Sequence, residues 1–192
     1  MTQSNNSTTG KCVANDSVLA VIDIQERLGA AMPTKVLNRV VQNTSLLCRS
    51  AELLEVPVAI TEQYPAGLGA TNPDVLNATP DSAPVLEKTT FSAHGSDGFA
   101  SWVQDSGRRS VILSGMEAHV CILQTALDLA AAGHQVYVVE DAICSRRLEN
   151  YQNAIDRLRQ SGISITSAES VVFEWLGDAR HPHFKAIQGL LR

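Results

Sequence analysis

Short, nearly continuous apolar runs alternate along the chain with segments whose apolar residues recur at helical spacing. The runs lie at residues 17–25, 56–64, 83–88, 111–113, 134–145 and 163–167. Continuous apolar runs are typical of strands that helices cover on both faces, and strands that alternate with helices form doubly wound parallel sheets. We therefore expect a three-layer α/β/α fold around a six-stranded parallel sheet with the Rossmann-like strand order 3-2-1-4-5-6.

The two ends of the chain depart from this pattern. Residues 1–16 are rich in Ser, Thr and Asn, so they offer little apolar surface to offset the entropy of ordering, and we expect a flexible tail. Residues 167–192 carry many apolar side chains, and we expect them to pack either on the domain or on another subunit. Since a chain of 192 residues can bury one sizeable core, we expect residues 17–192 to form a single domain.

Three residues with reactive side chains follow predicted strands. Asp23 lies near the end of the first run, Lys88 ends the third, and Cys121 lies near the first turn of the helix after the fourth. At a helix start, unpaired N–H groups and the positive end of the helix dipole favour a thiolate, so Cys121 is placed to be a nucleophile. Each residue also has an ordinary interpretation: Asp23 as a turn residue, Lys88 as a solvated charge, and Cys121 as a small buried side chain.

A parallel sheet would bring these three residues together. Ligands bind beyond the carboxyl ends of the strands in such sheets, and the first and fourth strands are neighbours where the strand order reverses. An aspartate as base, a lysine that stabilises negative charge and a cysteine as nucleophile form a complete set for acyl transfer. Asp23, Lys88 and Cys121 are therefore our candidate catalytic residues.

Four motifs resemble those of the isochorismatase-like cysteine hydrolase superfamily. They are VIDIQ with Asp23, the TEQY loop from Thr61, EKTTFSA with Lys88, and GMEAHVCILQTALDLAAAG with Cys121. The resemblance covers about residues 17–167, and the TEQYPAGLG loop and the ending GDARHPHFKAI are most similar to the YcaC-type and isochorismatase-domain-containing branch. It implies the six-stranded sheet and an Asp-Lys-Cys catalytic triad formed by Asp23, Lys88 and Cys121.

The resemblance also implies the surroundings of this triad. It places a non-proline cis peptide between Met116 and Glu117, and an oxyanion hole at the backbone amides of Glu117 and Cys121. Three further residues are candidates for lining the substrate pocket, with ordinary loop structure as the alternative for each: Gln63, Phe91 and His119.

The chain differs from some members of this superfamily. The nicotinamidases carry a D-x-H metal-binding motif after the second strand, where this chain has Thr61, Glu62 and Gln63. The five histidines show no metal-ligand spacing, so we expect neither nicotinamidase activity nor a metal or other cofactor. Isochorismatases cleave a vinyl ether without a cysteine nucleophile, so Cys121 favours hydrolysis of an amide or carbamoyl-type C–N bond through a thioester. Vinyl ether hydrolysis and a catalytically silent interaction protein on the same scaffold stay as alternatives.

Composition narrows the class of partner. A net charge of −5, a pI near 5.5 and the lack of basic clusters longer than an Arg pair argue against nucleic acid or an anionic membrane, and for a small molecule. The sequence begins without an apolar signal region, no run reaches a membrane span of about 18 residues, and the four cysteines show no C-x-x-C spacing. We expect a cytoplasmic homo-oligomer in which Cys48 is structural and Cys144 is either structural or incidental.

Overall fold

The computed structural model describes residues 10–191, and in it six strands form one sheet in the order β3-β2-β1-β4-β5-β6, with every neighbouring pair parallel. The strands are β1 (Ser17–Ile22), β2 (Val58–Gln63), β3 (Val85–Lys88), β4 (Ser110–Met116), β5 (Gln135–Cys144) and β6 (Ser164–Thr166). The predicted strand order is confirmed. Strand order reverses between β1 and β4, so the carboxyl ends of these two strands lie side by side.

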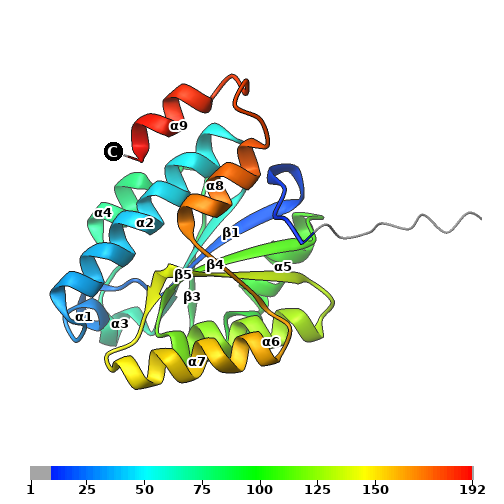
Figure 1. The fold of residues 1–192 in the computed structure, drawn as a ribbon. Helices are drawn as coiled ribbons and strands as arrows, with labels where there is room; N and C mark the ends of the chain where they lie inside the picture. The colour runs from blue at the N-terminus through cyan, green and yellow to red at the C-terminus, as the bar shows by residue number, and fades with distance from the viewer. Residues whose placement is uncertain (1–9, 192) are drawn as a thin grey trace, which may run out of the picture.

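The helices form a layer on each face of the sheet (Figure 1). One layer contains α2 (Thr34–Leu53), α4 (Pro73–Ala78), α8 (Ala168–Leu176) and α9 (Phe184–Leu190), and the other contains α5 (Asp97–Asp105), α6 (Leu123–Ala131) and α7 (Leu148–Gln160). The short helices α1 (Glu26–Gly29) and α3 (Pro65–Leu68) follow β1 and β2. The three-layer prediction is therefore confirmed. No helix within residues 10–191 is both long and apolar enough to cross a membrane.

Each face of the sheet has its own apolar core, because side chains alternate along a strand. In β1, Leu19 and Val21 pack with the layer of α2 and α8, whereas Val18, Ala20 and Ile22 pack with the layer of α5, α6 and α7. All five are fully buried. A strand buried on both faces needs apolar residues at successive positions, which explains the continuous run in the sequence.

The start of the chain is more ordered than its composition predicts. Cys12 is fully buried, and its backbone N–H and its thiol both donate to Glu174 Oε2 on α8, at 2.8 and 3.2 Å. Residues Ala14–Asp16 form a 3-10 turn. The predicted flexible tail is therefore wrong for residues 10–16, because one side chain there fills a place in the core, and the rest of the predicted tail lies outside the described residues.

The end of the chain packs on its own domain, which was one of the two expected outcomes. Its buried apolar residues join the core beneath α2: Val171, Val172, Trp175, Leu176 and Ile187. Packing on the domain thus covers part of the apolar surface of this segment, whereas Phe173 stays 42% exposed.

A glycine lets β4 approach the end of β1. Gly115 has a φ of +126°, and a Cβ atom on it would lie 1.9 Å from the carbonyl oxygen of Ile22. Only glycine fits so close to another backbone in this conformation. The close approach brings the residues that follow β4 next to those that follow β1, where the candidate site lies.

Candidate active site

Asp23 and Lys88 form a completely buried ion pair. Lys88 Nζ lies 2.8 Å from Asp23 Oδ2, and both side chains are 0% exposed. The hydroxyl group of Thr61 donates to Asp23 Oδ1 at 2.7 Å. Residues at the carboxyl ends of β1, β2 and β3 therefore meet at one place, and the interpretation of Lys88 as a solvated charge is wrong.

Three further acceptors surround the Lys88 ammonium group. Gln63 Oε1 accepts at 2.6 Å, and the carbonyl oxygens of Thr90 and Phe91 accept at 3.1 and 3.3 Å. The Gln63 backbone is fixed in turn by the side chain of Gln25, which donates to the Gln63 carbonyl and accepts from its N–H at 3.1 and 2.8 Å. Sequence reasoning missed this supporting role of Gln25, although the residue lies in the VIDIQ motif.

Cys121 lies in a wide helical turn directly after β4. Residues Ala118–Ile122 form a π-helical turn, and α6 continues the helix from it. The Glu117 carbonyl accepts hydrogen bonds from the N–H groups of Val120 at 3.0 Å and of Ile122 at 3.3 Å. In a regular α-helix the Cys121 N–H would take the i−4 bond to this carbonyl, so the wide turn transfers that bond from Cys121 to Ile122. The Met116–Glu117 peptide bond is cis.

The surroundings of Cys121 favour the thiol over the thiolate. Burial raises the pKa of the thiol to about 12, and the charge of Asp23 raises it as well, while Lys88 and the Glu117 N–H act in the opposite direction. Burial thus opposes the stabilisation of a thiolate that the helix start predicts, because Cys121 is only 6% exposed.

The pKa of Asp23 depends on both of the other candidate catalytic residues. Burial also raises the pKa of Asp23, and Lys88, Thr61 and the hydrogen-bonding interaction with the Cys121 side chain all lower it. Asp23 is therefore influenced by Lys88 and by Cys121 at the same time.

The structure gives the three predicted pocket residues different surroundings. The Gln63 amide contacts Lys88 and donates to the Thr89 carbonyl at 2.9 Å. Phe91 is 57% exposed. The ring of His119 is held on both sides, with Nδ1 3.0 Å from Ser145 Oγ and Nε2 3.2 Å from Asn150 Nδ2. The other cysteines are free and buried, and Cys48 and Cys144 lie in the core as expected of structural residues.

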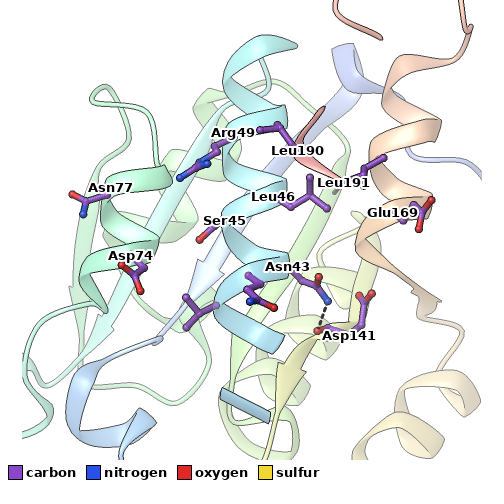
Figure 2. Close-up of a pocket in the computed structure, with 12 residues that line it drawn as sticks. Asn43, Ser45, Leu46, Arg49, Asp74, Asn77, Asp141, Glu169, Leu190 and Leu191 are labelled. Carbon is purple, nitrogen blue, oxygen red and sulfur yellow. Dashed lines mark hydrogen bonds between the residues drawn. The ribbon is translucent and has the colours of Figure 1, made fainter. Parts of the chain in front are cut away.

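One cavity adjoins the site and a larger one lies elsewhere. A cavity of about 510 Å³ is lined by Lys88 and by residues at the end of β3, in the segments after β2 and β3, and at the start of α5, among them Tyr64, Glu87 and Asp97. A cavity of about 710 Å³ lies among α2, α4, α8 and the chain end, where the Asn43 amide donates to the Asp141 carbonyl at 2.9 Å (Figure 2). Its lining contains none of the three candidate catalytic residues. Within residues 10–191, no three His, Cys, Asp or Glu side chains are grouped to hold a metal ion.

The chain is similar to known sequences along most of its length. Residues 17–170 match the family model described as the isochorismatase domain. The chain is 37% identical over 183 residues to isochorismatase domain-containing protein 1 of Salmo salar, covering 95% of this chain and 63% of that protein. It is 39% identical over 190 residues to a secreted isochorismatase effector of Phytophthora sojae, covering 95% and 88%. The chain thus spans less than two thirds of the length of the salmon relative.

Solved structures share the fold. A structure described as the MAR1 ribonuclease of Caenorhabditis elegans has a TM-score of 0.89 at 33% identity, covering 94% of this chain and 92% of that chain. The YcaC gene product of Escherichia coli, described as an octameric hydrolase of unknown specificity, has a TM-score of 0.81 at 23% identity, covering 94% of each chain. At 23% identity, the similarity to the E. coli protein shows a shared fold and nothing further.

Proposed function

The chain belongs to the isochorismatase family of hydrolases, and on this basis we propose that it is a cysteine hydrolase that cleaves an amide or carbamoyl-type C–N bond of a small molecule. The observation that carries the proposal is the fully buried Asp23–Lys88 pair next to the Cys121 thiol. A buried ion pair is costly and adds little net stability, whereas perturbed, charge-paired groups are typical of catalytic sites.

The mechanism follows from the protonation states. Asp23 accepts the thiol proton as Cys121 Sγ attacks the substrate carbonyl carbon, so the thiolate forms during attack and does not have to exist beforehand. The ammonium group of Lys88 and the N–H groups of Glu117 and Cys121 stabilise the tetrahedral oxyanion. Asp23 then protonates the leaving nitrogen, and the C–N bond breaks to leave a thioester. Water hydrolyses the thioester with Asp23 as base, which regenerates the thiol.

The size of the nearby cavity supports a small-molecule substrate. About 510 Å³ beside Lys88 falls within the range of roughly 300–1,000 Å³ that is usual for ligand pockets. Its lining residues Tyr64 and Thr90 directly follow and precede, in the chain, Gln63 and Phe91, which contact Lys88. The C. elegans neighbour is described as a ribonuclease, but the net charge of −5 here disfavours a polyanionic substrate. We therefore expect that the protein does not hydrolyse RNA, and RNA should be tested together with the small-molecule substrates.

The test is mass spectrometry of protein quenched during turnover of an accepted substrate from a panel of small amides, carbamoyl compounds and nitriles. An acyl adduct should appear on the peptide that contains Cys121, and Cys121→Ala should abolish both adduct and turnover. Asp23→Asn and Lys88→Met should each remove most of the rate, with strongly non-additive double changes. Cys48→Ala is the matched control, because Cys48 is also a buried cysteine but lies outside the site. This variant should still form the acyl adduct on Cys121.

Vinyl ether hydrolysis of the isochorismatase type is the second candidate. The raised pKa of Asp23 suits a carboxylic acid that donates a proton, and one relative at 39% identity is named an isochorismatase effector. Full activity of Cys121→Ala towards isochorismate would establish this chemistry and overturn the thioester. A wild-type thiol that reacts with no carbonyl substrate or electrophile would instead favour the interaction protein.

We also propose that the chain forms a homo-oligomer, as the E. coli protein with the same fold is described as octameric. Sedimentation at micromolar concentration tests this proposal. A single species at the monomer mass of 20.6 kDa would refute it.

A further inference from the structure

The loop that carries Glu117 and Cys121 is held by the segment that follows β5. We propose that residues 145–150, called here the anchor segment, position the backbone donors of the oxyanion hole. This inference rests on the proposed function, because it concerns the N–H groups that would stabilise the tetrahedral oxyanion. The anchor segment touches the loop through two separate side chains, one on each side of Ala118.

The first contact fixes Glu117. Its carboxylate oxygen Oε1 accepts from the backbone N–H of Arg146 at 3.0 Å and from Arg146 Nε at 3.1 Å. The Glu117 side chain is 6% exposed and the Arg146 side chain 57% exposed, so the acid points inward and the arginine covers it. This contact fixes the residue whose own N–H is one of the two proposed oxyanion donors.

The second contact fixes His119, between the two donors. His119 Nε2 lies 3.2 Å from Asn150 Nδ2, and His119 Nδ1 lies 3.0 Å from Ser145 Oγ. His119 is therefore a bridge between the end of β5 and the first turn of α7, and it ties the wide π-helical turn to both.

These contacts should affect the reaction beyond their effect on the stability of the fold. The Arg146 side chain is 57% exposed, so solvent screens its attraction to Glu117, and the Arg146 backbone N–H still donates to the buried carboxylate when the guanidinium group is removed. Oxyanion donors, in contrast, must lie within about 2.7–3.1 Å of the developing charge, and a displacement of about 1 Å costs on the order of a hundredfold in rate. The residues of the anchor segment are thus positioning residues, since they act through Glu117 and His119 and do not themselves touch substrate.

Two electrophiles that react with the Cys121 sulfur distinguish a loss of oxyanion-hole positioning from general damage to the site. p-Nitrophenyl acetate acylates a cysteine through a tetrahedral oxyanion, whereas iodoacetamide alkylates it by displacing iodide without one. Both rates are measured at Cys121 by mass spectrometry, for wild type, Asn150→Leu and Arg146→Ala. The matched controls are Asn153→Leu, an exposed residue of the same helix, and Arg159→Ala, whose side chain is 55% exposed and paired with Glu140.

The anchor variants should lower the acylation rate about tenfold or more and change the alkylation rate less than about twofold, while the control variants change neither. Arg146→Lys should recover most of the acylation rate, because it restores a cation near Glu117, whereas the backbone N–H is present in all of these variants. Acylation rates equal to wild type, or equal losses in both reactions, would overturn the proposal while leaving the proposed function intact. If wild-type Cys121 is alkylated but never acylated, the proposed function itself fails and the anchor role fails with it.

Discussion

Replacing Lys88 by Met should destabilise the fold by about 3–5 kcal/mol at pH 8, the usual effect of removing one partner of a buried ion pair. Met keeps most of the side-chain volume and removes the charge. The Asp23 carboxylate, 0% exposed, would be left without its cation. The Gln63 amide oxygen and the carbonyls of Thr90 and Phe91 would lose their donor as well.

The carboxylate part of this loss should depend on pH. Burial already raises the pKa of Asp23 above its ordinary value of 3.8, and Lys88 opposes this rise. Without Lys88 the pKa rises further, so the folded variant retains a proton that the unfolded chain releases above about pH 4. Stability is then lost as pH rises, by up to about 1.4 kcal/mol per pH unit until the pH passes the folded pKa. The variant should therefore differ less from wild type at pH 5 than at pH 8.

Urea unfolding under reducing conditions at pH 5 and pH 8 measures both effects, with the fluorescence of buried Trp175 as the signal. Adding Asp23→Asn to Lys88→Met should restore part of the stability at pH 8, since no uncompensated charge remains. Lys35→Met, at an exposed position of α2, is the control and should lie within about 0.5 kcal/mol of wild type. A Lys88→Met variant as stable as this control, or one whose deficit is the same at both pH values, would refute the reasoning.

Two further outcomes are expected. Burial raises the pKa of Cys48 to about 11 and that of Cys121 and Cys144 to about 12, against 9.0 for an ordinary thiol. The contribution of these thiols to the free energy of unfolding should therefore be fully present below pH 9 and be lost between pH 9 and 12, because the thiols of the unfolded chain ionise first. A urea midpoint that is constant from pH 8.5 to 10.5 under reductant would contradict this. Dialysis against a chelator should leave the hydrolysis rate unchanged, whereas a loss that zinc, iron or manganese restores would reveal a metal site.

The features that the sequence predicted well are those that depend on local pattern and chain order. The apolar runs predicted the strands because strands such as β1 are buried on both faces. Strand order placed Asp23 and Lys88 at one edge, and the structure pairs them. Their catalytic role, that of Cys121 and the oxyanion hole stay proposals.

The features that sequence analysis missed depend on contacts between distant residues. Cys12 is anchored by Glu174, which lies 162 residues away, so the average composition of the segment concealed one buried side chain. The protonation of the Cys121 thiol depends on how much water the surrounding core excludes, and a helix start alone does not reveal this. The contacts of the His119 ring nitrogens with Ser145 and Asn150 were not predicted, because the chain order does not place these residues beside it, and its place in the pocket lining stays a prediction.

Gly115 sets a limit on how this protein could be redesigned. Any side chain there would overlap the Ile22 backbone, so a saturation library at this codon should return glycine alone among folded clones. Codons for exposed residues of the surrounding loops, such as Phe91, should accept many replacements. Selection for new substrates would therefore act on the loops after β2 and β3, while the junction of β1 and β4 stays constant in every lineage that keeps the fold.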